Sequence, residues 1–163
     1  MKKTWQEKLV DKESLPKVLK LEKGFPCYNA VHKMGAEAGD EVVLVNPSEV
    51  VEIMKQVPEG KLITIFEICK KIAKQHDVKG CCSLTTGIFI MTAANAVEEA
   101  IQEGKLLDIP YWRTLKTDGF LNPKYPGGQE AHKKLLEQEG YKVLQKGKRF
   151  VVQDFQKHLA WID

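Results

Sequence analysis

Two helix starts separated by a short breaker constrain the fold of this chain more than any other feature. Asn46 is a good helix N-cap, and Pro47 suits the first helical position that follows it. The apolar residues after this start recur at helical spacing and are Val50, Val51, Met54 and Val57. The Pro- and Gly-containing segment 57–61 ends that helix, and a second one starts at Thr64, where Glu67 can reach back to form a capping box. These signals predict two amphipathic helices that share one core.

A third helix is predicted from about Thr85 to about Glu103, after the turn "HDVKGCCSL". Its predicted inward face consists of Phe89, Ala93, Ala96, Val97 and Ala100. The second and third helices, joined by a short Gly-containing turn, are consistent with a helix-turn-helix. Helical hairpins that bind nothing are also common, so this alternative stays open. The lysines of the second helix, which are Lys70, Lys71 and Lys74, can likewise form a simple solvated face.

The last third of the chain predicts a helix and a β-hairpin. The helix lies in "PGGQEAHKKLLEQEG" and stops at Gly140, and "YKVLQKGKRFVVQ" then alternates about a turn at Lys146 and Gly147. A hairpin after a helix-turn-helix is the winged-helix arrangement, and its basic residues could reach phosphates or form an ordinary charged surface. These residues are Lys142, Lys146, Lys148 and Arg149. The segment "DFQKHLAWI" is expected to form a short helix at the end.

The rest of the sequence favours one globular domain with an extension. We expect a mostly α fold with a small β-hairpin, a winged helix-turn-helix over residues 47–163, and an N-terminal extension over residues 1–46. Within the extension, residues 41–45 suit a strand and residues 24–40 read as irregular.

Composition narrows the setting and the cofactors. With 43% hydrophobic and 29% charged residues, no apolar run that could span a bilayer, and no apolar signal segment, we expect a cytoplasmic monomer without membrane contact. A net charge of +3 permits a nucleic-acid partner without arguing strongly for one. The four cysteines lack a C-x-x-C pair, which favours reduced, buried thiols and no metal site. We expect no cofactor.

Four motifs in order resemble one family. They are "VPEGKLITI" at 57–65, "PYWR" at 110–113, Gly119, and "LLEQEG" at 135–140. This order resembles the DNA-binding domain of the O6-alkylguanine-DNA alkyltransferases, the methylated-DNA–protein-cysteine methyltransferases. The resemblance covers roughly residues 47 to 152.

The departures from that family pattern bear on the chemistry. Tyr111 stands where the family has its alkyl-accepting cysteine, and Trp112 stands where it has a proton-relaying histidine. Glu139 matches the glutamate of that relay, now without the histidine. A phenol is a poor nucleophile at neutral pH and an indole cannot shuttle protons, so the resemblance implies a protein that is not an enzyme. An alternative, weaker interpretation is an enzyme that uses Cys69, Cys81 or Cys82 as the acceptor.

A branch of the family is similar in lacking the acceptor. The alkyltransferase-like proteins bind alkylated guanine in DNA and pass the lesion to other repair proteins. This chain departs from the branch as well, because Ile65 occupies the position of a tyrosine that helps rotate the nucleotide, and the third helix has no arginine to fill the gap in the base stack.

The resemblance also implies site residues. The "PYWR" loop lies where the family has its alkyl pocket, so a base-sized aromatic pocket is expected from Tyr111, Trp112, Phe120 and Tyr125. The alternative is that these rings fill a vestigial pocket. Arg113 is expected to form a structural ion pair, and Glu139 is assigned a structural role.

Direct DNA contacts are expected from the third helix and the hairpin. They are Thr85, Thr86, Gly87, Thr92, Asn95, Lys146, Lys148 and Arg149. The third-helix N-terminus favours phosphate, and Gly87 allows close approach of the backbone. For Thr92 and Asn95 the alternative is that both side chains bond to the preceding helical turn.

The sequence therefore predicts a non-catalytic protein that binds double-stranded DNA and recognises O6-alkylated guanine in DNA repair, with repair proteins as further partners. The alternative is a winged-helix scaffold for protein–protein or regulatory contacts without lesion recognition, which the uncharged third helix favours.

Overall fold

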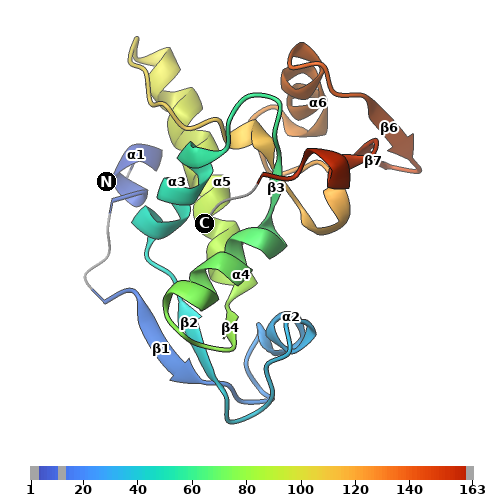
Figure 1. The fold of residues 1–163 in the computed structure, drawn as a ribbon. Helices are drawn as coiled ribbons and strands as arrows, with labels where there is room; N and C mark the ends of the chain where they lie inside the picture. Colours follow the sequence, from blue (N-terminus) through green and yellow to red (C-terminus); the bar gives the residue numbers. More distant parts are fainter. Residues whose placement is uncertain (1–3, 11–13, 161–163) are drawn as a thin grey trace.

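Six α-helices and three small sheets make up the fold in the computed structural model, which describes residues 4–10 and 14–160 (Figure 1). The elements of the first half are α1 (Trp5–Lys8), β1 (Lys17–Lys20), α2 (Tyr28–Lys33), β2 (Glu41–Leu44), α3 (Pro47–Gln56), β3 (Ile63–Thr64) and α4 (Ile65–Gln75). The second half holds β4 (Gly80–Cys81), α5 (Ser83–Gln102), β5 (Thr114–Leu115), α6 (Gly128–Gln138), β6 (Val143–Lys146) and β7 (Arg149–Val152). Short 3-10 turns are η1 (Tyr111–Arg113), η2 (Thr117–Gly119) and η3 (Phe155–His158).

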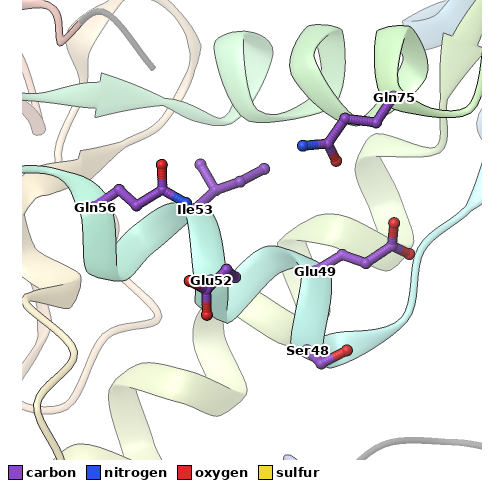
Figure 2. A pocket seen from close by; sticks show the side chains of 6 residues that line it. All are labelled: Ser48, Glu49, Glu52, Ile53, Gln56 and Gln75. Carbon is purple, nitrogen blue, oxygen red and sulfur yellow. The ribbon is translucent and has the colours of Figure 1, made fainter. Parts of the chain in front are cut away.

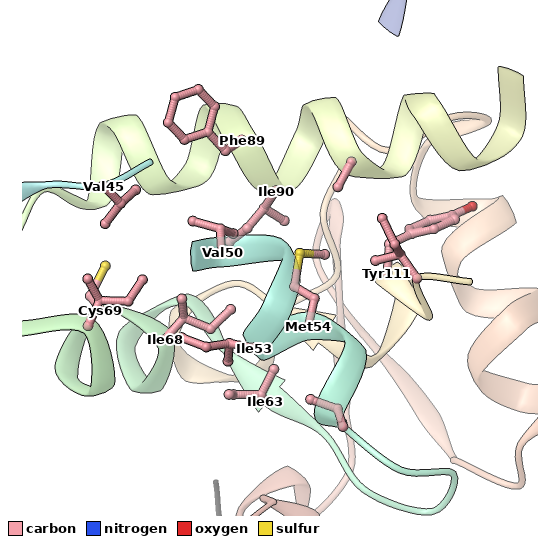
Figure 3. Close-up of a cluster of buried hydrophobic side chains, with 14 of the residues drawn as sticks. Val45, Val50, Ile53, Met54, Ile63, Ile68, Cys69, Phe89, Ile90 and Tyr111 are labelled. Carbon is pink, nitrogen blue, oxygen red and sulfur yellow. The ribbon is translucent and has the colours of Figure 1, made fainter. Parts of the chain in front are cut away.

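The three central helices follow the sequence signals closely. Capping boxes start α3 at Asn46 and α4 at Thr64, with Glu49 and Glu67 as the reciprocal partners, so both predicted helix starts are confirmed. Val50, Ile53 and Met54 of α3 are buried in the main core, where α3 packs against α4 and α5 (Figure 3). The predicted inward face of α5 is buried throughout. The helix begins at Ser83, two residues before the expected start.

The N-terminal segment is more ordered than its sequence indicates. The expectation that residues 24–40 are irregular is wrong, because they contain α2. Strand β2 was expected, but β1 was not; β1 pairs antiparallel with β2, and β2 pairs parallel with β4 in the turn between α4 and α5. Residues 41–44 are therefore hydrogen-bonded to the connection between α4 and α5, just before the start of α5.

The C-terminal part confirms the predicted helix and hairpin. Gly140, with a φ of +92°, follows the end of α6, and β6 and β7 pair antiparallel around Gly147. Beyond the hairpin the expected short final helix is present as the 3-10 helix η3 over residues 155–158, without a side-chain cap; residues 161–163 lie outside the described part. The amide of Ala160 donates to the Leu62 carbonyl and closes this end of the core.

The expectation about the fold class changes in consequence. The fold is a mixture of helices and three small sheets, not a mostly α fold with one hairpin, because the sheet β1–β2–β4 and the pair β3–β5 are also present. Among the helices of the described residues, none combines the length and apolar character that crossing a bilayer requires.

Candidate DNA interface

The "PYWR" loop forms the 3-10 turn η1, whose first side chain points into the core. Tyr111 is 2% exposed and meets Trp112 and Tyr125 edge to face, at centroid distances of 5.4 and 5.1 Å. Burial, with the charge of Glu98 adding to it, holds the pKa of Tyr111 above its ordinary value. The phenol is therefore neutral at physiological pH. Because the ring is covered, a base can reach Tyr111 only if the loop opens.

Tyr125 and His132 are hydrogen-bonded to the backbone of this loop. The single Tyr125 hydroxyl proton is shared between the Thr114 carbonyl at 2.8 Å and the Tyr111 carbonyl at 3.2 Å. The Asn122 amide donates to His132 Nδ1 at 3.1 Å, so the imidazole proton resides on Nε2, which donates to the Trp112 carbonyl at 2.8 Å. These four hydrogen bonds fix the path of the loop.

His132 is a site residue that the sequence reasoning missed. It is 1% exposed, and burial lowers its pKa to about 4, against the opposing effect of its hydrogen bond to the Trp112 carbonyl. The signal that could have found it is its position one turn before the buried Leu136, on the same face of α6.

Arg113 and Glu139 form a two-pronged ion pair behind the loop. Arg113 Nε lies 3.0 Å from Glu139 Oε1, Nη2 lies 2.8 Å from Oε2, and Nη1 donates to the Val57 carbonyl at 2.8 Å. The two side chains are only 14% and 11% exposed. Burial works to raise the pKa of Glu139, but the hydrogen bonds and the charge of Arg113 outweigh it, so the pKa lies below its ordinary value. Glu139 is therefore an anion paired with Arg113.

Phe120 belongs to the hairpin side of the site. Its ring lies under the Arg149 guanidinium, 3.6 Å from centroid to Cζ, and its backbone bridges to Val151 of β7. The structure thus brings Tyr111, Trp112 and Tyr125 together, while Phe120 supports Arg149.

The polar side chains at the start of α5 are bonded within the helix. Thr86 is fully buried and donates to the Cys82 carbonyl at 2.9 Å, and the Thr85 hydroxyl lies 3.4 Å from Cys82 Sγ. Thr92 donates to the Ile88 carbonyl at 2.7 Å and Asn95 to the Met91 carbonyl at 3.0 Å, which is the alternative left open for those two residues. A direct DNA contact by Thr86 or Thr92 requires the hydroxyl to leave the interior.

The hairpin carries exposed basic side chains on a braced backbone. Lys142, Lys146, Lys148 and Arg149 are all exposed. Gln129 of α6 accepts from the Phe150 amide at 3.1 Å, and its side-chain nitrogen donates to the Lys148 carbonyl at 3.4 Å. These bonds fix the direction in which the hairpin points its charges.

Two surface cavities lie away from the loop. One, of about 360 Å³, lies between α3 and α4 and is lined by Ser48, Glu49, Glu52, Ile53, Gln56 and Gln75 (Figure 2). The other, of about 410 Å³, is lined by residues 39–41 and 77–79. Both are polar and open, and neither includes an aromatic ring on which a base could stack.

The cysteines are free and buried, and the described residues hold no group of metal-ligating side chains that could bind an ion. Cys82 lies at the N-cap of α5 without capping that helix through its side chain.

Comparison with known proteins decides the family. Residues 47–141, more than half of the chain, match the family described as 6-O-methylguanine DNA methyltransferase, DNA binding domain. The chain belongs to this family. Within the methyltransferase family match lie α3, α4, α5, the "PYWR" loop, α6 and the Arg113–Glu139 pair.

Two solved structures share the methyltransferase-family fold seen here. One is S. pombe ATL in complex with DNA, at 16% identity and a TM-score of 0.50, and the other is S. pombe Atl1 in complex with damaged DNA containing O6-carboxymethylguanine, at 18% identity and a TM-score of 0.50. Each match covers 71% of this chain and 94% of the other. No curated protein is significantly similar in sequence.

Proposed function

We propose that this chain is a non-catalytic DNA-binding protein that recognises O6-alkylated guanine in duplex DNA and acts in repair. In this proposal residues 47–163 form a winged helix-turn-helix, with α4 and α5 as the helix pair and β6–β7 as the wing, and residues 1–46 are an extension. The family membership and the likeness to Atl1 in complex with DNA carrying an alkylated guanine support it.

The chemistry at the "PYWR" loop carries the non-catalytic part of the proposal. By the family resemblance Tyr111 takes the position of the acceptor cysteine, and its buried phenol has a raised pKa. A neutral phenol is a weak nucleophile, and Trp112 beside it offers no acceptor for a proton. Glu139, which would complete a relay, is occupied by Arg113. Alkyl transfer therefore lacks both a nucleophile and a base.

The exposed hairpin charges support the DNA-binding part. Three cations on a braced turn, Lys146, Lys148 and Arg149, can each neutralise a phosphate, and the Arg149 guanidinium already lies over the Phe120 ring. We propose that they supply most of the sequence-independent affinity. Handing a lesion on to other repair machinery then needs a protein partner, which we include in the proposal.

A binding titration with two duplexes tests the function. Fluorescence anisotropy with an O6-methylguanine duplex and its unmodified twin is expected to show tighter binding to the modified one. Intact-mass spectrometry of the same mixture is expected to show no added methyl group. Equal affinity for both duplexes would remove lesion recognition, and a stoichiometric mass gain on any cysteine would remove the non-catalytic assignment.

A charge-matched pair of variants tests the role of the hairpin. Changing Lys146, Lys148 and Arg149 to Ala should weaken binding and flatten the slope of log affinity against log salt. The change in slope should correspond to the loss of up to about three phosphate contacts. The control removes three cations on or beside other elements, which are Lys8, Lys55 and Lys105. An unchanged salt slope in the hairpin variant, or the same loss in the control, would show that the hairpin is not the contact.

A further inference from the structure

The outward face at the start of α5 is apolar. Leu84 is 50% exposed and Ile88 is 56% exposed. They stand four residues apart, so both side chains lie on one face of the helix, a single turn from each other. Seven large hydrophobic residues of the described chain are exposed, and these two are the ones that stand together in this way.

The apolar face continues onto α4. Gly87 lies within the same turn of α5, and a Cβ placed on it would lie 3.4 Å from Ile65 Cδ1, the half-buried first residue of α4. Because Gly87 has no side chain, Leu84 and Ile88 project beyond the helix surface between them. At Gly87 the space that a side chain would take is bordered by Ile65, so α5 lies close to α4 beside the two exposed residues.

The threonine hydroxyls around this face are already hydrogen-bonded. The hydroxyls of Thr85 and Thr86 are bonded to Cys82, and Thr92 is bonded to the Ile88 carbonyl. No charged residue occurs between Cys81 and Val97. Contact with Leu84 and Ile88 themselves is therefore apolar, while the first-turn backbone amides of α5 can still meet a phosphate.

The size of the face distinguishes between two kinds of partner. A stable protein–protein interface buries about 800 Å² on each partner, which two half-exposed side chains cannot approach. One or two apolar side chains are, in contrast, sufficient to wedge open a base step in DNA. The face also lies on the second helix of the helix pair, within the residues that match a DNA-binding domain.

We propose that Leu84 and Ile88 form an apolar wedge that inserts between stacked base pairs of the bound duplex. This inference rests on the proposed DNA-binding function and adds the means by which the duplex is opened. The wedge replaces base stacking by contact with the two side chains, so no hydrogen bond from α5 is required.

Stacking-sensitive fluorescence tests the wedge separately from binding. A duplex carries O6-methylguanine with 2-aminopurine as its neighbour, and anisotropy on the same sample reports binding. At saturation the wild-type protein should raise 2-aminopurine fluorescence severalfold. The double variant Leu84→Ala, Ile88→Ala should abolish most of that rise and weaken binding on the order of tenfold. Ile101→Ala is the control, since Ile101 is 54% exposed near the other end of α5, and it should match wild type.

The outcomes separate the two proposals. Saturable wild-type binding without a fluorescence rise, or a full rise with the double variant, overturns the wedge and leaves the proposed function in place. Absence of wild-type binding to either duplex overturns both. A change of oligomeric state in the DNA-free double variant, measured by sedimentation, would show that the face joins copies of the chain and also overturns the wedge. Both substitutions are at exposed positions, so the unfolding temperature should stay within a few degrees of wild type.

Discussion

Removing Arg113 should uncouple the "PYWR" loop from the rest of the domain at a measurable cost in stability. Arg113→Ala deletes the two-pronged pairing to Glu139 and the bond to the Val57 carbonyl. Hydrogen bonds to a charged partner contribute ~1.5–3 kcal/mol, and breaking a fully buried ion pair costs ~3–5 kcal/mol. Because these side chains keep 14% and 11% exposure, we expect a loss of ~2–4 kcal/mol.

A double-mutant cycle isolates the pair from its surroundings. Glu139→Gln removes the charge but keeps an oxygen that can accept from Arg113, so it should cost less than Arg113→Ala. The double variant should show a coupling of ~1–3 kcal/mol. Urea unfolding monitored by tryptophan fluorescence measures each corner, and Tm should fall by ~4–16 °C for Arg113→Ala in a chain of this length. Glu137→Gln, an exposed change in α6, is the control and should stay within ~0.5 kcal/mol.

Low pH should remove the difference in stability between the wild type and Arg113→Ala. In the wild type the folded pKa of Glu139 lies below its unfolded value, so the contribution is fully present above the unfolded pKa of about 4.3 and is lost as the pH falls through the folded pKa. Without Arg113, burial raises the pKa of Glu139 instead, and the carboxyl protonates earlier on the way to acid. The gap between wild type and Arg113→Ala should therefore narrow below about pH 4. A gap under ~0.5 kcal/mol at pH 7, or one that stays constant down to pH 3, would refute the reasoning.

Three further changes probe the same site. His132 has a folded pKa near 4, below its unfolded value of about 6.5, so its contribution to the free energy of unfolding is fully present above pH 6.5 and falls by about 3 kcal/mol towards pH 4. His132→Gln should flatten this pH dependence in unfolding measured across the same range. Gly87→Ala should raise the stability of the free protein by up to ~1 kcal/mol, because Ala favours the helix more than Gly does and the new Cβ makes an ordinary contact with Ile65. It should weaken DNA binding if the backbone approaches DNA there, and equal affinity of the variant and the wild type would exclude close approach. Tyr111→Ala should cost ~3–5 kcal/mol of stability and ~1–3 kcal/mol of preference for modified DNA, whereas Tyr111→Phe keeps both; equal loss on modified and unmodified duplexes would mean that the loop is only core.

The helices could be predicted because their signals are local. Asn46 and Thr64 each place a cap, a reciprocal carboxylate and an apolar face within a few residues, and the structure reproduces both. The sheet β1–β2–β4 could not be predicted in the same way, since β4 has two residues and is a strand only because β2 pairs with it from across the chain. Local propensity carries no information about such a partner.

The candidate site shows the same contrast between local signals and long-range contacts. An ion pair at Arg113 could be expected from an isolated arginine beside aromatic rings, but its partner lies 26 residues away, just beyond the end of α6, and appears only when η1 packs against that helix. His132 was missed because two lysines follow it directly in "EAHKKLL", which suggests an exposed face. It is buried because it shares a face of α6 with Leu136. Its role depends on two backbone groups to which it is hydrogen-bonded beside Tyr125, the Asn122 amide and the Trp112 carbonyl.

The Arg113–Glu139 pair also gives a physical reason for a glutamate at a site that has no histidine to relay a proton. Glu139 stands just beyond the end of α6 and is nearly buried, where an unpaired carboxylate would be costly. Arg113 neutralises it and at the same time holds the Val57 carbonyl at the end of α3, so one guanidinium joins α3, η1 and the end of α6. A catalytic relay needs a group that can take up and release a proton near neutral pH. Trp112, which by the family resemblance takes the place of the histidine, cannot do that, and Glu139, held as an anion by Arg113, can instead keep the loop rigid. The same residue that would serve transfer in a catalytic site thus serves the shape of the loop in this one.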